Sequence, residues 1–253
     1  MTKLTALIIT YNEIDRIRDC IQSISFADEI IVIDSYSKDG TYEYLKNLSN
    51  VKVLQNPFEN FTKQKTYALE QAHNDWILFI DADERIPPRL QDEIVSILKS
   101  EKTNDAYWCY RIFMFKNKQL RFSGFQTDKA VRLFKKSKCH FRPNRIVHER
   151  LEVNGTTGTL KNKLIHFSYR NFKVHKEKII KYARLRAREE FKKAIRPNWF
   201  HFYVKPTYRF LYNYLIRLGF LDGRKGIIMC YMGWLGVYVR YKELKKMYNS
   251  TDN

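Results

Sequence analysis

The stretch WILFIDADER, residues 76–85, decides the fold. Its first five residues are apolar, which is typical of a strand buried on both faces of a sheet. The strand ends on three carboxylates, Asp81, Asp83 and Glu84. Carboxylates at the end of a buried strand repel one another and lose hydration, so they need a cation, hydrogen-bond donors or open water nearby. The sequence therefore predicts a compensating group at this strand end.

Strand and helix patterns alternate on the N-terminal side of this stretch. Strands are expected at 4–11, 29–34 and 51–55, and helices at 13–24, 41–48 and 62–73. Pro87 and Pro88 mark the start of a further helix, and residues 105–170 are β-rich. Strands separated by helices of this length indicate βαβ units. The predicted fold class is α/β, with a mixed, mostly parallel sheet flanked by helices.

Three of these strands end in polar residues. They are Thr10 to Glu13 after the first strand, Asp34 and Ser35 after the second, and Asp81 to Glu84 after the fourth. Right-handed crossovers place the carboxyl ends of parallel strands along one edge. Open α/β sheets bind ligands outside that edge, so we expect these groups to converge on one crevice.

Composition bounds the class of protein. The 253 residues are 44% hydrophobic, which is enough for a core. The net charge is +19, and residues 161–253 carry 22 basic side chains against 6 acidic ones, so most of the excess lies in the C-terminal third. Nucleic acid, anionic membrane and phosphorylated substrates are all admissible partners of such a surface.

Cysteine spacing and the apolar runs predict the compartment. The four cysteines lie far apart without a CxxC pair, which favours neither a zinc site nor a disulfide framework. The N-terminal apolar run is too short for a signal peptide. The longest apolar run, 226–239, is shorter than the roughly 20 residues that a spanning helix needs. We expect a cytoplasmic protein.

Asp81 and Asp83 are candidates for binding a metal. In an extended segment, residues two apart point the same way, so both side chains can address one ligand. Mg²⁺ or Mn²⁺ bound through one or two carboxylates and substrate phosphate oxygens is the ordinary arrangement, and it stabilises a departing diphosphate. The alternative is a solvated turn with an aspartate at a helix cap, and the DxD pattern alone does not separate the two.

The surrounding stretches resemble the family 2 glycosyltransferases. They are LIITYNE (7–13), IIVIDSYSKDGT (30–41), QKTYALEQAHNDWILFIDADE (64–84), RLF (132–134) and VHE (147–149). VHE, LIHFSY (164–169) and RLGFLDGRKGI (217–227) are more narrowly similar to bacterial lipopolysaccharide-core β-1,4-glucosyltransferases. The resemblance implies a GT-A fold and a nucleotide-sugar donor. The chain departs from the family at Tyr36, where glycine is common, at Lys38, where threonine is common, and at Thr66, where asparagine is common.

The resemblance also implies roles for individual residues. Thr10, Tyr11 and Glu13 would contact uridine and ribose, and Asp34 would hydrogen-bond the base. Lys65 would lie near the diphosphate. Asp81 would bind ribose or metal, and Asp83 would bind the metal. The structural alternatives are helix caps for Thr10 and Asp34, a first-turn acid for Glu13, and a solvated helix residue for Lys65.

Inversion at an anomeric carbon requires a base that deprotonates the attacking hydroxyl. Glu149 is the candidate, and His148 beside it could position a phosphate, ligate the metal or serve as the base itself. Asp128 is a weaker alternative base. His166 is either functional or a satisfied core histidine, and Glu149 could instead form a surface ion pair with Arg145 or Arg150.

The C-terminal part is predicted to be helical and to bind membranes. Residues 174–195 have a helical pattern that is rich in lysine and arginine, and aromatic residues alternate with basic ones from 198 to 221. Such a surface suits lipid headgroups, although the helix could equally pack on its own domain. We expect a catalytic domain at 1–170 and a basic helical region at 171–253 that associates with the inner face of the cytoplasmic membrane.

Together these features predict an inverting, metal-dependent hexosyltransferase. Its donor would be a nucleotide-sugar, most simply UDP-glucose, its acceptor a lipid-linked saccharide such as the lipopolysaccharide inner core, and its cofactor Mg²⁺ or Mn²⁺. One alternative is a nucleic-acid-binding protein, which leaves the acidic strand ends unexplained, so nucleic acid is not expected as a partner. The other is a sugar nucleotidyltransferase, which would usually show a glycine-rich loop after the first strand; ITYNEIDR has no glycine.

Overall fold

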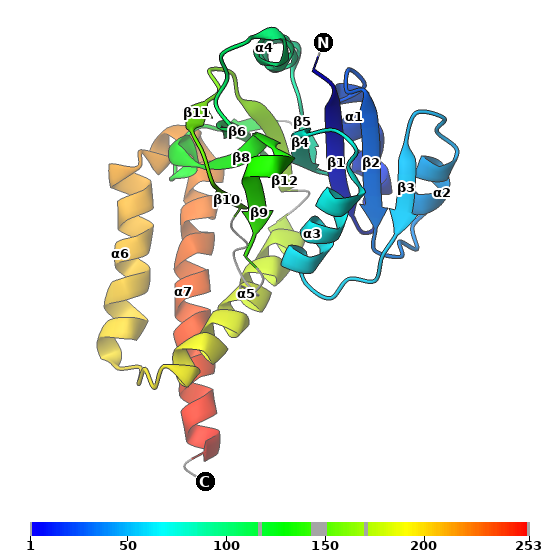
Figure 1. Cartoon of the computed structure of the whole chain (residues 1–253). Helices are drawn as coiled ribbons and strands as arrows, with labels where there is room; N and C mark the ends of the chain where they lie inside the picture. The colour runs from blue at the N-terminus through cyan, green and yellow to red at the C-terminus, as the bar shows by residue number, and fades with distance from the viewer. Residues whose placement is uncertain (1, 116–117, 143–150, 170–171, 252–253) are drawn as a thin grey trace. The chain divides into compact units, whose positions relative to one another are not determined.

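The computed structural model describes residues 2–115, 118–142, 151–169 and 172–251 (Figure 1). The chain forms two compact units. The first contains residues 1–111 and 129–166, and the second contains residues 112–128 and 167–253. The predicted assignment of catalysis to 1–170 and of membrane binding to 171–253 stays a prediction, because compactness does not tell what a unit does.

Four parallel strands form the centre of the first unit. They lie in the order β3-β2-β1-β4, and their bounds are β1 (Leu4–Thr10), β2 (Glu29–Asp34), β3 (Lys52–Gln55) and β4 (Trp76–Asp81). β8 (Lys129–Lys135) pairs antiparallel with β4, and β6 (Ala106–Phe115) pairs antiparallel with β8. The sheet is therefore mixed and mostly parallel, as predicted. The acidic strand ends belong to its parallel strands.

Helices cover both faces of this sheet. Their bounds are α1 (Ile14–Ser23), α2 (Thr41–Lys46), α3 (Phe61–Gln71) and α4 (Pro88–Lys99). Trp76, Leu78 and Ile80 of β4 belong to the core cluster that α1, α2 and α4 complete, whereas Ile77 and Phe79 belong to the cluster with α3. Successive side chains of a strand point to opposite faces, so a strand that is covered twice must be apolar throughout.

Short strands complete the first unit. β5 (Glu84–Arg85) pairs antiparallel with β12 (Leu164–Tyr169), which sets Glu84 opposite His166. β11 (Thr157–Thr159) pairs with β6. β9 (Cys139–Phe141), which follows the 3₁₀ turn η2 (Lys136–Lys138), pairs with β10 (Leu151–Val153). All four cysteines of the chain are buried thiols, in line with the absence of a disulfide pattern.

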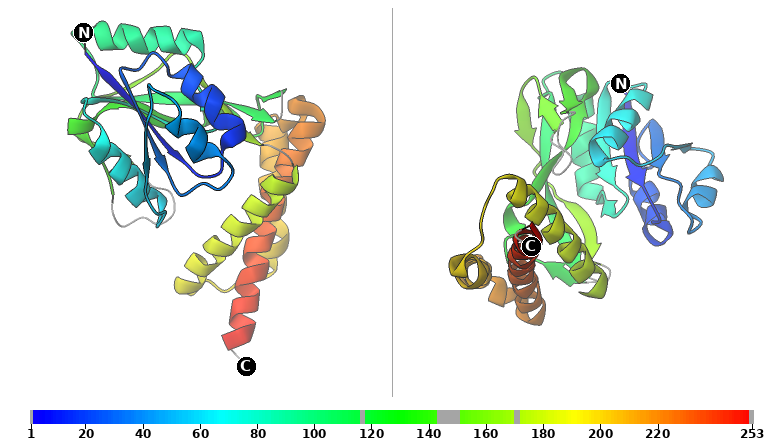
Figure 2. Two further views of the ribbon diagram at one scale, coloured as in Figure 1. Left: turned by 90° about the vertical axis from the view of Figure 1, so that its right-hand side faces the viewer. Right: turned by 90° about the horizontal axis from the view of Figure 1, so that it is seen from below.

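The second unit is mostly helical. The end of β6 pairs with β7 (Lys118–Leu120), and η1 (Phe125–Thr127) follows. The helical elements are α5 (Phe172–Lys192), η3 (Phe200–Val204), α6 (Lys205–Leu211), η4 (Tyr212–Ile216), η5 (Gly219–Asp222) and α7 (Gly223–Thr251). Both α5 and α6 pack on α7 (Figure 2). Among the described residues, no helix combines the length and the apolar character that crossing a membrane requires.

Candidate active site

The polar strand ends meet at one edge of the parallel sheet. Thr10 is in register with Asp34 on one side of β1, and Ile9 is in register with Asp81 on the other. Neighbouring strands lie roughly 4.8 Å apart, so these three ends occupy adjacent positions. The backbone N–H of Ser35 donates to the carbonyl of Thr10 at 2.9 Å, which joins the loops that leave β1 and β2. The predicted convergence is confirmed.

Asp81 and Asp83 do not lie in one extended segment, so the geometry that was expected for them is wrong, whereas a ligand shared by the two stays a prediction. Residues 82 and 83 form a turn between β4 and β5, so Asp81 ends one strand and Asp83 lies in the turn. A turn rotates successive side chains away from the alternation of a strand. The two carboxylates consequently have different nearest cations.

Arg132 of β8 compensates the charge at the end of β4. Its Nη2 lies 2.5 Å from Oδ2 of Asp81 and 2.5 Å from Oε1 of Glu84. The arginine side chain is 7% exposed and that of Glu84 is fully buried. Nη1 of Arg111 lies 3.6 Å from the same Glu84 oxygen. Cations of the protein therefore supply part of the compensation that was predicted at this strand end.

The carboxyl groups respond differently to these surroundings. Burial raises the pKa of Asp81, but the charges of Arg132, Lys65 and His166 outweigh it and hold the pKa well below its usual range. The pKa of Glu84 is shifted in the opposite direction. Burial, aided by the negative charge of Asp81, raises its pKa despite Arg132. Asp81 is therefore a carboxylate at neutral pH.

Asp83 lies between an arginine and a histidine. Nη1 of Arg16 is 3.4 Å from Oδ2, and Nε2 of His166 is 3.3 Å from Oδ1. Burial raises the pKa of Asp83, but the hydrogen bond and charge of His166 and the charge of Arg16 lower it overall. β12 brings the ring of His166 to Asp83, so this histidine belongs to the acidic cluster, and its predicted function stays a prediction.

The residues expected to contact the nucleotide differ in exposure. Tyr11 is 55% exposed. Thr10 is buried, and its Oγ1 has no hydrogen-bond partner within the described part of the chain. Lys65 of α3 lies with its Nζ 5.7 Å from the centre of the Phe79 ring and acts electrostatically on Asp81. A buried hydroxyl without a partner is costly unless something else bonds it, which favours a ligand at the end of β1.

Asp34 is held by hydrogen bonds at the end of β2. It is fully buried and accepts hydrogen bonds from the N–H of Ser37 at 2.9 Å, the Oγ of Ser37 at 2.5 Å and the Nε2 of Gln55 at 3.3 Å. These bonds shape the loop after β2. The predicted contact of Asp34 with a nucleotide base stays a prediction.

The loops after β1 and β2 hold each other in place. The N–H of Asn12 donates to Oγ of Ser37, and the N–H of Lys38 donates to Oδ1 of Asn12, both at 2.8 Å. Tyr36 has a φ of +59°, a backbone conformation in which glycine is favoured. Glu13 precedes α1 without capping it through its side chain, and its N–H donates to Oγ1 of Thr41 at 3.0 Å.

The candidate bases are not all placed. Glu149 and His148 lie outside the described residues, as do Arg145 and Arg150, so their predicted roles stay predictions. Asp128 belongs to the second unit, where it follows η1 and its N–H donates to the carbonyl of Phe125 at 3.4 Å.

Arg132, Arg111 and Arg16 are the site residues that sequence reasoning missed. Arg132 begins the quoted RLF stretch, but nothing local shows that it faces the carboxylates 51 residues earlier. Arg16 is one of several charged residues on α1. Arg132 could have been suspected because it lies between the apolar residues Val131 and Leu133 inside a strand, where charges need a partner.

The donor atoms fit a cation that is shared with a substrate. The described ranges, whose gaps include 143–150, contain no group of three or more metal-binding side chains that could hold a metal ion. The side chains considered are those of histidine, cysteine, aspartate and glutamate. Asp81 and Asp83 nevertheless offer carboxylate oxygens at one edge, and Asp81 raises the pKa of Asp83, so the two lie close enough to interact. Mg²⁺ commonly binds through one or two carboxylates while phosphate and water oxygens complete its shell.

The sheet order, the acidic strand ends and the helices on both faces define a GT-A-like fold. The crystal structure of S. aureus TarS shares it, with a TM-score of 0.51 and 17% identity over 98% of this chain and 55% of that chain. Residues 5–177 match the family model for glycosyl transferase family 2, and the protein belongs to that family.

Relatives align along nearly the whole chain. An uncharacterized glycosyltransferase of Rickettsia felis is 30% identical over 97% of this chain and 90% of its own length. The lipopolysaccharide core biosynthesis glycosyltransferase LpsC of Rhizobium meliloti is 25% identical over 94% of this chain and 93% of its own. The expected family and fold are thereby confirmed.

Proposed function

We propose that this glycosyltransferase transfers a hexose, with inversion, from a uridine diphosphate sugar to a lipid-linked saccharide. Glucose from UDP-glucose is the first donor to test. The acceptor class follows from the likeness to LpsC, whose name assigns it to lipopolysaccharide core biosynthesis, and from the basic C-terminal third. In this proposal, the enzyme acts at the inner face of the cytoplasmic membrane.

The observation that carries the proposal is the edge where β1, β2 and β4 end. In a family 2 chain, this edge presents an unpartnered buried hydroxyl on Thr10 and two ionised carboxylates, Asp81 and Asp83. A nucleoside diphosphate offers what these groups lack. Its ribose and base carry donors for the hydroxyl and carboxylates, and its phosphates carry the negative charge that a shared cation would join to the aspartates.

In the proposed arrangement, each residue keeps the role that the family implies. Thr10, Tyr11 and Glu13 contact the nucleoside, Asp34 supports or binds the base, and Lys65 lies by the diphosphate. Asp81 binds ribose or metal and Asp83 binds the metal. When bound, Mg²⁺ or Mn²⁺ supplies an offset for the charge that develops on the leaving diphosphate.

Arg132 and Arg16 hold the two aspartates before any ligand arrives. Fixed orientation matters because charged groups placed in advance cost no reorganisation when the bond to the leaving group breaks. His166 restrains the other oxygen of Asp83. Glu149, or His148 in its place, takes the proton of the acceptor hydroxyl. The hydroxyl oxygen displaces the diphosphate in a single step, and the anomeric configuration is therefore inverted.

The test is UDP release from a panel of UDP-sugars with Mn²⁺ or Mg²⁺, with and without truncated lipopolysaccharide. We expect acceptor-dependent release that chelation abolishes. Asp83→Asn should reduce kcat at least about 100-fold, since a missing electrostatic stabiliser at a reacting centre typically costs that much. Mn²⁺ binding, followed separately by electron paramagnetic resonance, should weaken in the same variant.

The matched control is Asp92→Asn on α4, where the side chain is exposed and away from the strand ends. It should leave both turnover and Mn²⁺ binding unchanged. Full activity of Asp83→Asn would remove the metal assignment, and activity of Glu149→Gln equal to wild type would remove that residue as the base.

A further inference from the structure

The second unit carries an exposed apolar face on a single helical stretch. η3, α6 and η4 follow one another without a break from 200 to 216. Large apolar side chains recur along it at helical spacing and are between 36% and 68% exposed: Phe200, Val204, Tyr208, Leu211, Leu215 and Ile216. Trp199 and Tyr203 beside them are 69% and 70% exposed.

The inner face of this stretch already has its partners. Phe202 packs in the cluster around Tyr241 and Leu244, and Pro206 and Asn213 are buried. When both the packed face and the exposed face of a helix are apolar, we expect the exposed face to be buried in another apolar environment rather than to stay in water. Exposed apolar residues arranged together mark interaction surfaces, whereas singly scattered ones do not.

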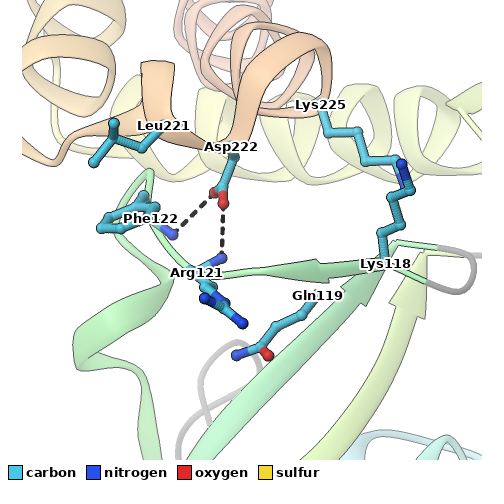
Figure 3. Close-up of a pocket in the computed structure, with 7 residues that line it drawn as sticks. All are labelled: Lys118, Gln119, Arg121, Phe122, Leu221, Asp222 and Lys225. Atoms are coloured by element: carbon cyan, nitrogen blue, oxygen red, sulfur yellow. Dashed lines mark hydrogen bonds between the residues drawn. The ribbon is translucent and has the colours of Figure 1, made fainter.

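A basic pocket belongs to the same unit. Figure 3 shows it between the β7 region and the start of α7. Its volume is about 500 Å³. Its lining residues are Lys118, Gln119, Arg121, Phe122, Leu221, Asp222 and Lys225. Leu221 is 54% exposed and continues the run of exposed apolar side chains beyond η4.

The pocket has three cationic side chains and one carboxylate, and the carboxylate already accepts two backbone hydrogen bonds within the pocket. Asp222 accepts hydrogen bonds from the backbone N–H groups of Arg121, at 3.0 Å, and Phe122, at 2.9 Å. Nζ of Lys225 donates to the carbonyl of Phe115 at 3.0 Å, which orients the lysine. Clustered lysine and arginine of this kind attract anionic oxygens such as phosphate.

We propose that this unit docks on an anionic membrane, with the apolar face of 199–216 entering the interfacial layer and the pocket of Lys118, Arg121 and Lys225 holding a lipid phosphate. This rests on the proposed function, because a lipid-linked acceptor places the enzyme at a bilayer. Charge selects this occupant, since 22 basic against 6 acidic residues in 161–253 complement anionic headgroups. Exposed tryptophan and tyrosine suit the headgroup level.

The docking face lies in the aromatic stretch 198–221 of the predicted basic region and not on the helix predicted at 174–195. The basic helix predicted at 174–195 is α5, and its buried residues Ala183 and Ala187 face the rest of its unit. Its open face is charged and lacks a continuous apolar stripe, so it can be attracted to a surface but has little to insert. The face on η3, α6 and η4 supplies apolar area, which is what anchors an interfacial helix.

The experiment measures co-sedimentation of the full chain with phosphatidylcholine vesicles, with and without phosphatidylglycerol. Wild type should bind the anionic vesicles, less so as NaCl is raised, and Trp199 fluorescence should shift to the blue. Leu215→Ser with Ile216→Ser should weaken binding at least about tenfold, because two exposed apolar side chains no longer enter the layer. Lys118→Gln with Arg121→Gln should weaken binding about 30-fold on anionic vesicles only.

The matched control removes the same charge from α5 through Lys181→Gln with Arg184→Gln, both exposed. It should change binding less than about threefold, since these two exposed cations belong to α5 and neither to the apolar stretch 199–216 nor to the pocket. Circular dichroism checks that every variant folds. Inorganic phosphate titrated by calorimetry separates a soluble ligand from a lipid: phosphate binding that the pocket variant loses while its vesicle binding persists would assign the pocket to free phosphate and overturn its lipid role.

Two further outcomes overturn the proposal. One is wild-type vesicle binding by the Leu215, Ile216 variant. The other is a dimer in solution that this variant abolishes, because the face would then be covered by a second copy. Donor hydrolysis measured without vesicles reports on the catalytic proposal alone. A protein that hydrolyses UDP-sugar but ignores vesicles would therefore refute only the docking surface.

Discussion

At the scale of single residues, the acidic cluster is a network rather than a bare metal site. Arg132 contacts Asp81 and Glu84, and Arg16 and His166 contact Asp83. Charges that leave water need both a partner and good geometry, or their desolvation exceeds the attraction between them. The arginines hold these carboxyl groups in place, and under the proposed function the same groups would face the diphosphate of the donor.

Arg132→Met should destabilise the protein by about 3–5 kcal/mol, because it leaves a fully buried Glu84 and the ionised Asp81 without their main cation. Urea unfolding followed by fluorescence measures the change. The control is Arg142→Gln, which removes an ion pair between Arg142 and Glu152 from a surface where the arginine is 57% exposed, and should cost less than about 1 kcal/mol. Equal effects of the two changes would show that Arg132 is an ordinary surface partner.

At the scale of elements, the loops after β1 and β2 show how one departure from the family is accommodated. Tyr36 stands where the family commonly has glycine, and its φ is +59°. Its side chain is half exposed, so little packing holds it in this strained region. Asp34 and Ser37 on either side fix the loop through their hydrogen bonds, and these offset the strain.

Tyr36→Gly should stabilise the protein by up to about 1 kcal/mol. It relieves roughly 1–2 kcal/mol of left-handed strain and gives part of this back as backbone entropy in the unfolded chain. Tyr36→Ala keeps the Cβ atom and should bring no gain. Urea midpoints of the three proteins provide the measurement, and a glycine variant less stable than the alanine variant would refute the strain argument.

At the scale of the whole molecule, stability depends on pH through groups in both units. Burial and the charge of Lys178 lower the pKa of His175 to about 4, from 6.5. In the first unit, carboxyl pKa values are lowered at Asp81, Asp83 and Asp39, where neighbouring cations or hydrogen-bond donors outweigh burial. Glu84 acts in the opposite direction, since its pKa is raised.

Stability should therefore fall in two stages as the solution is acidified. Between pH 6.5 and about 4, the unfolded chain protonates His175 while the folded chain does not, so this contribution is lost first. Below the ordinary aspartate range, protonation of Asp81, Asp83 and Asp39 removes stability that is fully present above it. Urea midpoints measured across this pH range test both stages. The variant His175→Gln should lose less stability between pH 6.5 and about 4 and behave as wild type below that range. An unchanged loss between pH 6.5 and about 4 in that variant would contradict the assignment.

The sequence by itself determined the βαβ order, the doubly buried strand at 76–80 and the convergence of Thr10, Asp34 and Asp81. Periodicity and polar strand ends are local signals, and parallel pairing with right-handed crossovers turns them into one edge. It also determined the family, because several linked stretches match it along residues 5–177.

Only the tertiary structure decided how the carboxylates are compensated and which face of the second unit is open. Arg132 reaches Asp81 across 51 residues, and β12 brings His166 to Asp83 through a strand pair that no local pattern specifies. Likewise, the alternation of aromatic and basic residues near 200–216 does not tell which side packs on α7 and which stays exposed. Burial and ion pairing depend on neighbours distant in sequence, so they are fixed only when the chain has folded.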